Sequence, residues 1–488
     1  MPISNMAQSN GSVGVKLDFT TFHNVINGEL CGSSTGKTRC GVNPATLEDN
    51  PPVPVSTLDD IEKAVQAARK AAPSWASKPW DERKKAIFAF VDAFEANIGD
   101  FMQMLTKEQG KVTPDAQMEL GLTGQFVRGI CEHTLPDEVM EENDQRKAIK
   151  RYVPFSVAVG IVPWNFPIFI AIIKAISSLI TGCPLILKPS PYTPYCGLKL
   201  AELGQRFFPP GVLQALSGDD NLGPWLTSYP GIDMVSFTGS VAVGKKVMES
   251  CSKTLKRCVL ELGGNDPAIV CSDVDIESTA AKIGFFSFTN CGQICAIPKR
   301  IYVHESIYDK FLAAIAGYAT SLGSKQGEPA IGPVANRPQY ERLQSMLADI
   351  EANKYTIAAG STKPPTDRQG LYLTPTVVDN PPDNSRIVAE EPFGPVLPLL
   401  KWSDESDVIY RANNTDYGLG ASVWSRNAAE AERIARQLQA GTVWVNAHAE
   451  MDPSFPFGGF KSSGIGEQYG VEGLKAYCNL QTMYIKLV

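Results

Sequence analysis

Three polar side chains are placed where they could carry out covalent chemistry on a carbonyl group. Cys295 lies in a stretch with glycine and glutamine just past a predicted helix, and Glu261 interrupts an apolar strand that is followed by two glycines. Asn165 lies between aromatic and proline residues at the end of another predicted strand. A thiolate is a good nucleophile, a carboxylate in apolar surroundings has a raised pKa and can act as a general base, and an amide NH2 can donate to an oxyanion. The set predicts a nucleophile, a base and an oxyanion donor.

Each of these residues also has a simpler structural explanation. Most cysteines are small buried apolar residues, and a buried glutamate often forms a salt bridge or lies at a strand edge. None of the three is a histidine, whereas a Cys–His hydrolase needs an imidazole beside its thiol. The pattern therefore argues against that class of hydrolase.

Two segments have the features of a nucleotide-binding site. Residues 238–240 end an apolar strand and open a helix whose free amides would attract a phosphate, although a plain strand–helix turn has the same pattern. The following run to Lys246 is similar to a phosphate-binding loop, but Lys246 stands where Ser or Thr would hold magnesium, so we discount ATP. Lys188 follows another strand and would lie on the ligand side of a parallel sheet, or is simply a solvated loop lysine.

Short apolar runs that alternate with helices predict an α/β fold with two domains in series, each holding a doubly wound parallel sheet. Residues 57–120 read as helices with Thr57 as a candidate N-cap, and residues 136–153 as a projecting hairpin. The last strand candidate, 483–488, has no obvious partner within a domain, so we expect it to pair with the hairpin of another subunit. The predicted strands are 157–162, 184–188, 212–216 and 234–239, then 267–270, 300–304, 373–378 and 441–446.

Composition excludes several classes of protein. The 488 residues carry 45 Lys+Arg against 52 Asp+Glu, a formal charge of −7, which argues against a nucleic-acid partner. The 11 cysteines are irregularly spaced without a CxxC, and the 4 histidines are scattered, so we expect no metal site and no disulfide framework. A reducing, cytoplasmic location is the simplest interpretation, since the N-terminus is polar and lacks a signal-peptide core. The apolar stretch 166–187 is broken by prolines, a glycine and Lys174, which favours a buried helix and strand over a membrane span.

Seven motifs occur in one order along nearly the whole chain: PWNFP at 163–167, LKPS at 187–190, FTGS at 237–240 with Gly244, LELGGNDP at 260–267, GQIC at 292–295, EEPFGPV at 390–396 and PFGGFKSSG at 456–464. In these motifs the sequence resembles the aldehyde dehydrogenase superfamily. The resemblance implies an NAD(P)-binding domain (1–135 and 154–260), a catalytic domain (261–455) and an oligomerisation β-flap (136–153 and 475–488). It also implies a homodimer or homotetramer.

The resemblance assigns the catalytic roles. Cys295 matches the family nucleophile, whereas Cys291 lies upstream of the motif. Its thiolate would attack an aldehyde, the Asn165 side chain and the Cys295 N–H would hold the oxyanion, and Glu261 would activate water to hydrolyse the thioester to an acid. The presence of Glu261 favours hydrolysis over acyl transfer to coenzyme A, which remains the alternative reaction. A catalytically silent member with a structural or binding role is the non-enzyme alternative.

The resemblance also implies a dinucleotide site, in which Glu391 would bind the nicotinamide ribose. Pro191 replaces a carboxylate that often binds the adenosine ribose, so NADP becomes possible beside the expected NAD. Gln468 stands where many members have a glutamate, which puts any proton-relay role of that position in doubt, although Glu467 is adjacent. The candidate cofactor residues are Ile161, Pro163, Trp164, Lys188, Ser190, Pro191, Phe237, Gly239, Ser240, Val243, Leu262, Glu391 and Phe393.

Matching positions predict an apolar substrate pocket without an arginine to bind a second carboxylate. We therefore expect a medium-sized aliphatic or aromatic aldehyde rather than a dicarboxylic semialdehyde. His448 and Glu450 would either add a polar contact or face away. The candidate lining is Phe166, Ile170, Ile173, Thr289, Ile294, Met451 and Phe457.

Overall fold

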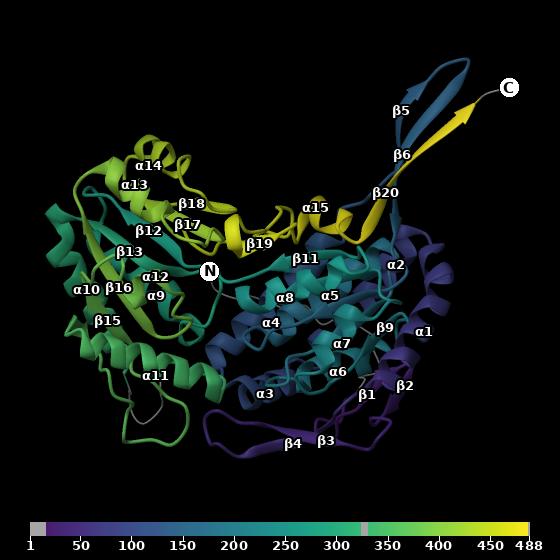
Figure 1. The fold of residues 1–488 in the computed structure, drawn as a ribbon, viewed down its shortest axis with the longest axis horizontal. Coiled ribbons are helices and arrows are strands. Elements are labelled where there is room, and N and C mark those ends of the chain that lie inside the picture. Colours follow the sequence, from purple (N-terminus) through teal and green to yellow (C-terminus); the bar gives the residue numbers. More distant parts are fainter. Residues whose placement is uncertain (1–15, 324–329, 487–488) are drawn as a thin grey trace.

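A computed structural model describes residues 16–323 and 330–486. It has two lobes, each built on one large sheet, and a thin flap that projects from the first lobe (Figure 1). The residues before 16 and after 486, which include the ends of the predicted NAD(P)-binding domain and flap, lie outside the described residues. The α/β fold class predicted from the sequence is confirmed.

The N-terminal part combines short strands with a helical layer. Thr57 caps the first long helix as predicted, because its side chain accepts the N–H of Asp60 while the Asp60 carboxylate accepts the N–H of Thr57. A hairpin of two strands runs along the bottom of the first lobe in Figure 1, and its connecting loop reaches toward the second lobe. In its connecting loop, the carbonyl of Pro44 accepts the N–H of Leu371 from the second lobe at 2.8 Å. The elements are β1 (Asn24–Ile26), β2 (Glu29–Cys31), the hairpin strands β3 (Thr38–Val42) and β4 (Asp49–Pro54), α1 (Leu58–Ala76), α2 (Trp80–Ala96), α3 (Ile98–Gln109) and α4 (Thr113–Ile130).

The first large sheet has eight strands in the order β19-β11-β10-β7-β8-β9-β1-β2. Strands β7 to β11 are mutually parallel, and buried side chains cover both faces of the sheet: one face packs on α5 and α6 and the other on α1, α7 and α8. α6 ends at Gly204, and the next side chain, Gln205, donates to the carbonyl oxygens of Ala201 at 2.7 Å and Leu213 at 2.9 Å. The elements are β7 (Ala158–Ile161), α5 (Pro167–Thr181), β8 (Leu185–Lys188), α6 (Tyr195–Gly204), β9 (Leu213–Ala215), α7 (Leu222–Ser228), β10 (Met234–Thr238), α8 (Val241–Ser252) and β11 (Arg257–Glu261).

The second large sheet has seven strands in the order β14-β15-β16-β13-β12-β17-β18. After β18 the chain returns to the first lobe, where β19 (Gly464–Ile465) pairs with β11. The elements are β12 (Asp266–Val270), α9 (Ile276–Phe288), η1 (Thr289–Gly292), β13 (Pro298–His304), η2 (Glu305–Ile307), α10 (Tyr308–Ser321), α11 (Arg337–Ala352), β14 (Thr356–Ala359), β15 (Thr376–Asp379), α12 (Arg386–Ala389), β16 (Val396–Trp402), α13 (Glu405–Asn413), β17 (Gly420–Trp424), α14 (Ala428–Ala435), β18 (Thr442–Val445), η3 (Lys461–Ser463) and α15 (Gly470–Lys475).

The flap is a three-stranded antiparallel sheet of β5 (Glu138–Glu142), β6 (Arg146–Pro154) and β20 (Cys478–Lys486), in the order β20-β6-β5. The expectation that the C-terminal strand pairs with another subunit's hairpin is wrong. β20 pairs with β6 of its own chain, from Cys478 opposite Pro154 to Lys486 opposite Arg146. The reason is local: the carbonyl of Tyr477, just after α15, accepts the N–H of Phe155, which follows β6, at 3.0 Å.

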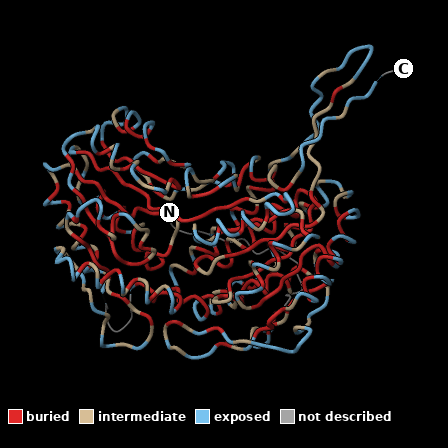
Figure 2. Tube along the Cα trace, viewed as in Figure 1, coloured by how far each residue is buried: buried red, intermediate tan, exposed pale blue. Residues whose placement is uncertain are grey.

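The core lies along the strands of both lobes, whereas the flap is largely exposed (Figure 2). The apolar stretch at 166–187 forms the buried helix α5 and the buried strand β8, as predicted. Within residues 16–323 and 330–486, no helix is both long and apolar enough to cross a bilayer.

Candidate active site

The carboxyl ends of four neighbouring parallel strands bring several predicted residues to one edge of the first sheet. Ile161 of β7 lies beside Lys188 of β8 on one side and beside Phe237 of β10 on the other, while Thr238 lies beside Glu261 of β11. The strand order reverses between β7 and β10. Open α/β sheets bind ligands at such a switch point, so this edge is the expected place for a site.

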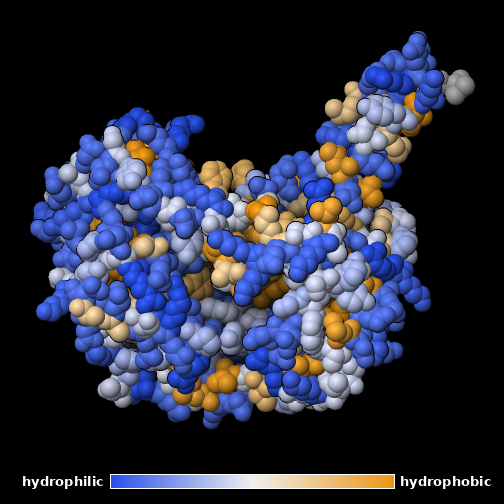
Figure 3. Space-filling model, in the orientation of Figure 1, coloured by the Kyte–Doolittle hydropathy of each residue, from blue (hydrophilic) through white to orange (hydrophobic). Residues whose placement is uncertain are grey.

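One cavity between the lobes brings the three predicted catalytic residues together. Asn165 and Glu261 follow or end strands of the first lobe, whereas Cys295 lies in the connection from α9 to β13 of the second lobe. All three line the same cavity, which encloses about 150 Å³. On the face shown in Figure 3 the surface is hollowed between the two lobes. Cys291 is fully buried and is absent from the cavity lining.

The Cys295 thiol and the Glu261 carboxylate line the same cavity, and each influences the pKa of the other. Burial raises the pKa of Glu261, while the neighbouring Cys295 thiol and the charge of Lys174 lower it. Burial also raises the pKa of Cys295 and Glu261 raises it further, whereas Lys299 lowers it. Oε1 of Glu261 is buried without a hydrogen-bond partner in the described chain, an arrangement suited to a water or a reacting group.

A left-handed turn carries the chain into Cys295. Asn290, Cys291 and Gly292 have φ values of 51°, 59° and 69°, a conformation that costs energy for the two residues with side chains. A Cβ on Gly292 would lie 2.3 Å from the carbonyl oxygen of Gly394, so only glycine fits there. The turn is bonded to the Asn165 segment: the Asn165 Nδ2 donates to the carbonyl of Gln293 at 3.0 Å, and the Asn290 Nδ2 to that of Asn165 at 3.2 Å.

The first turns of α4 hold both of these segments. Asp115 Oδ2 accepts the N–H of Asn290 at 3.1 Å. Glu119 Oε1 accepts the N–H groups of Ile168 and Phe169, the free amides at the start of α5, at 2.8 and 3.0 Å. Lys111 pairs with the other Glu119 oxygen at 3.1 Å. Sequence reasoning missed these residues; a Lys and two acids at four-residue spacing were the available signal.

The groups along the sheet edge fit a dinucleotide. The rings of Trp164 and Phe393 meet edge to face at 5.3 Å, and Leu262 packs so closely on α8 that a Cβ on Gly244 would lie 2.5 Å from it. Ser240 caps α8 by accepting the N–H of Val243, whose side chain is 45% exposed and offers apolar surface beside the helix start. Phe237 and Gly239 are in contact there, with Pro163 just beyond β7.

Glu391, the predicted ribose-binding residue, contacts the segment between β11 and β12. Its Oε1 accepts the N–H of Gly264 and lies 3.1 Å from the Nζ of Lys299. Burial raises the pKa of Glu391, and Lys299 lowers it. The carboxylate is thus neutralised by a lysine that sequence reasoning did not single out.

Lys188 is buried rather than solvated. Its Nζ donates to the carbonyl of Pro189 at 3.2 Å, and burial lowers its pKa to about 8, with Asp220 opposing the shift. Ser190 is also buried and bridges to Thr193, and Pro191 lines a separate cavity of about 330 Å³ with Arg39. The predicted adenosine-side residues therefore form one connected segment after β8.

The cavity beside Cys295 is lined by apolar and aromatic side chains. It includes Phe166, Ile170, Thr289, Ile294, Met451 and Phe457. Ile173 does not line it: one turn further along α5, it faces a small cavity behind the site with Lys174. Sequence reasoning missed further lining residues on α4, α5, α9 and near the C-terminus, namely Met118, Leu122, Phe126, Phe169, Phe285, Phe286, Ala296, Ile297, Ala449, Gln468 and Tyr469.

His448 faces away from the cavity. It is fully buried and bonded to Ser422, with its Nε2 3.4 Å from Asp266. Glu450 is exposed.

Lys174 lies behind Glu261. Its Nζ donates to Ser236 at 2.8 Å, and burial lowers its pKa to about 7 while Glu261 opposes the shift. Gln468 reaches the same region and donates to Thr238 at 3.3 Å. The signal in the sequence was a lone lysine inside an otherwise apolar helix.

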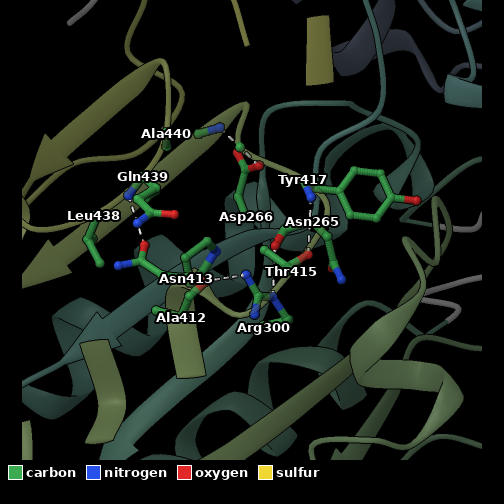
Figure 4. Close-up of a pocket in the computed structure, with 14 residues that line it drawn as sticks. Asn265, Asp266, Arg300, Ala412, Asn413, Thr415, Tyr417, Leu438, Gln439 and Ala440 are labelled. Carbon is green, nitrogen blue, oxygen red and sulfur yellow. Dashed lines mark hydrogen bonds between the residues drawn. The ribbon is translucent and has the colours of Figure 1, made fainter. Parts of the chain in front are cut away.

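A buried arginine supports the turn that follows Glu261 (Figure 4). Arg300 Nε donates to the carbonyl of Asn265 at 2.8 Å, and its Nη2 to that of Ala412 at 2.9 Å. Arg300 therefore ties the turn after Glu261 to α13 of the second lobe. In the part of the chain that the structure describes, no three His, Cys, Asp or Glu side chains gather as metal ligands would.

Comparisons with known proteins agree with this geometry. Residues 32–483 match the Aldehyde dehydrogenase family. Aldehyde dehydrogenase LUC3 of Fusarium sp is 38% identical over 96% of this chain and 100% of its own length. Succinate-semialdehyde dehydrogenase [NADP(+)] GabD of Escherichia coli is 32% identical over 95% of this chain and 97% of its own. The NAD+ complex of an aldehyde dehydrogenase from Bacillus cereus superposes with a TM-score of 0.92 at 31% identity, covering 98% of this chain and 100% of that chain.

The chain belongs to the aldehyde dehydrogenase family. It is an NAD(P)-dependent enzyme that oxidises an aldehyde to the acid.

Proposed function

We propose that the enzyme oxidises a medium-sized aliphatic or aromatic aldehyde with Cys295 as nucleophile, Glu261 as base and Asn165 as oxyanion donor. The observation that carries the proposal is that Cys295, Glu261 and Asn165 line one largely apolar cavity. Low polarity strengthens the interaction of an oxyanion with its donors, since less water competes for them.

The first half of the reaction forms a carbon–sulfur bond. Glu261 takes the thiol proton, the Cys295 thiolate attacks the aldehyde carbon, and the carbonyl oxygen becomes an oxyanion. One N–H of the Asn165 amide is bonded to the carbonyl of Gln293, which fixes the other N–H for this oxyanion together with the Cys295 N–H. When bound, the nicotinamide supplies the oxidant that accepts a hydride from the substrate carbon.

The second half of the reaction breaks the carbon–sulfur bond. Glu261 first releases the thiol proton to solvent. It then takes a proton from a water whose oxygen attacks the thioester carbon. The carbon–sulfur bond breaks, the Cys295 thiolate leaves and a carboxylic acid is released. The buried, unpartnered Oε1 of Glu261 supports this role.

The same residues argue against the other reactions considered. Transfer of the acyl group to coenzyme A needs no water-activating base, so Glu261 favours hydrolysis. A product assay distinguishes the two, because hydrolysis yields free acid and acyl transfer yields a thioester of coenzyme A. Replacing Cys295 by Ala tests the silent-member alternative: NADH formation should disappear, and full residual activity would refute the assignment of the nucleophile.

The apolar lining supports the substrate class. The only charged side chain along the described cavity lining is Glu261, so a second carboxylate would find no cation there. Steady-state kinetics with a panel of aldehydes should give the highest kcat/KM for apolar chains or aryl groups. Best turnover with succinate semialdehyde would contradict the proposal.

The cofactor would lie along the switch point, with Glu391 at the nicotinamide ribose and Lys188 at the adenosine ribose. NAD is the first expectation, and the absence of a carboxylate at Pro191 also permits NADP. Steady-state kinetics measured with NAD and with NADP test this order of cofactor preference.

We assign the dinucleotide to a domain of residues 1–135 and 154–260 and the thiol chemistry to residues 261–455. The exposed apolar side chains of the flap, such as Leu480 and Tyr484, favour its burial in a homodimer or homotetramer. Sedimentation would test the oligomer, and cell fractionation the expected cytoplasmic location.

A further inference from the structure

Lys299 is a buried ammonium that contacts three separate segments of the site. The residue belongs to β13 and is 4% exposed. Its Nζ donates to the carbonyl oxygens of Gly264 at 2.8 Å and Cys295 at 2.5 Å, and it lies 3.1 Å from Oε1 of Glu391. An ammonium has three N–H donors: two of them donate to these carbonyl oxygens, and Glu391 is the ion-pair partner of the charge.

Those contacts connect the nucleophile with the cofactor side. Cys295 belongs to the strained connection from α9, and Glu391 to the segment between α12 and β16. The same Glu391 oxygen accepts the N–H of Gly264, and Lys299 lies 5.8 Å from the centre of the Phe393 ring. With Oε1 engaged, Oε2 is the carboxylate oxygen that remains for a sugar hydroxyl.

The charge of Lys299 also opposes the negative groups near the thiol. Glu261 and Glu391 both disfavour a thiolate at Cys295, and Tyr469 is a further titratable group beside this pair. The charge of Lys174 interacts mainly with the Glu261 carboxylate. Lys299 is therefore the cation in direct contact with the Cys295 residue itself, through its carbonyl.

We propose that Lys299 is a positioning residue that couples the nucleophile to the cofactor site. Its ammonium fixes the Cys295 backbone and the Glu391 carboxylate in one geometry, and its charge favours the thiolate. The cofactor part of this inference rests on the proposed function, whereas the effect on the thiol does not.

The test compares Lys299→Met with Lys299→Arg, which keeps the charge. On the resting enzyme, the rate of Cys295 alkylation by iodoacetamide is measured against pH by mass spectrometry of the peptide. We expect Lys299→Met to raise the alkylation midpoint by about one pH unit, which slows the reaction at neutral pH about tenfold. Its KM for the cofactor should rise about tenfold, the order expected for a charged hydrogen bond that orients a ligand group. Lys299→Arg should restore most of both properties.

Lys199→Met is the matched control. Lys199 is also buried and ion-paired, to Glu202 at 2.5 Å, but it lies in α6 away from the cavity. The control should leave the alkylation profile and the cofactor KM unchanged.

Three results would overturn the inference: an unchanged alkylation profile in folded Lys299→Met, equal defects in the Met and Arg variants, or an equal shift in the control. If Lys299→Met does not fold, Glu391→Gln provides the second test. Removing that carboxylate should speed up alkylation, since Lys299 would then act on the thiol unopposed, and no change would refute the inference. If the Lys299 variants show the expected shifts in the alkylation profile but the unmodified protein oxidises no aldehyde, the proposed function is refuted instead.

Discussion

Asp115 offers a direct test of whether α4 sets the geometry of the oxyanion site. Its carboxylate accepts the N–H of Asn290, and the Asn290 side chain in turn donates to the Asn165 carbonyl. Asp115→Ala removes the acceptor and leaves that amide, in a residue only 2% exposed, without a partner. The strained turn should then relax away from Asn165.

The size of the effect follows from the lost bond. Leaving a buried donor unsatisfied costs about 1–3 kcal/mol, and each 1.4 kcal/mol corresponds to a factor of about ten in rate. Because the Asn165 amide is misplaced rather than removed, we expect kcat to fall about tenfold, below the roughly 100- to 1,000-fold cost of deleting an oxyanion donor. The KM for the cofactor should stay constant, since Asp115 does not contact that side.

Single-turnover NADH formation is the assay, with Asp115→Asn as the conservative variant and Gln117→Ala as an exposed control on the same helix. Asn keeps an oxygen acceptor and should recover most of the rate. The decisive measurement is the double variant with Asn165→Ala. If Asp115 acts through Asn165, replacing Asp115 should lower the rate of NADH formation only slightly further when Asn165 is already Ala. An undiminished tenfold loss there would refute the reasoning.

Three further outcomes follow from the charges and the cavity. Glu261→Gln should slow the first turnover, because the thiol loses its base, and should then stall as an acyl-enzyme after about one NADH per Cys295, visible as a mass increase; steady turnover would exclude Glu261 as the hydrolytic base. Lys174→Met should move the acid limb of the pH–rate profile to higher pH, because Lys174 lowers the raised pKa of Glu261 and the base must be deprotonated to act; a limb that stays in place would show that Lys174 does not influence the base. Ile170→Phe should reduce kcat/KM for long aldehydes more than for short ones, since it fills the cavity; equal losses across a chain-length series would place the substrate elsewhere.

The residues at the ends of strands could be predicted from the sequence because strand periodicity and motif position fix where they lie. Glu261 and Lys188 fall at the ends of parallel strands, and register alone brings them to one edge. Asn165 and Cys295 also line the predicted cavity, but their proximity depends on the packing of two lobes that no local pattern describes.

The supporting charges could not be predicted in the same way. Lys299 and Glu391 are more than ninety residues apart, and nothing in either neighbourhood indicates that they form a pair. The prediction that Ile173 lines the substrate cavity was wrong. Helical spacing predicts which face of α5 a residue lies on, but not how far along the helix the cavity extends. The C-terminal strand was assigned to another subunit because its partner β6 lies more than three hundred residues earlier in the chain.

The hairpin loop at Pro44 has a consequence for how the enzyme admits its cofactor. This loop ties the bottom of the first lobe to Leu371, while β19 brings the chain back across the top. A wide hinge opening would break the hydrogen bond between Pro44 and Leu371 and strain the β19–β11 pairing, so we expect the dinucleotide to enter without a large separation of the lobes. Because the same contacts connect the two lobes, we expect the lobes to unfold together, and calorimetry should record a single cooperative transition.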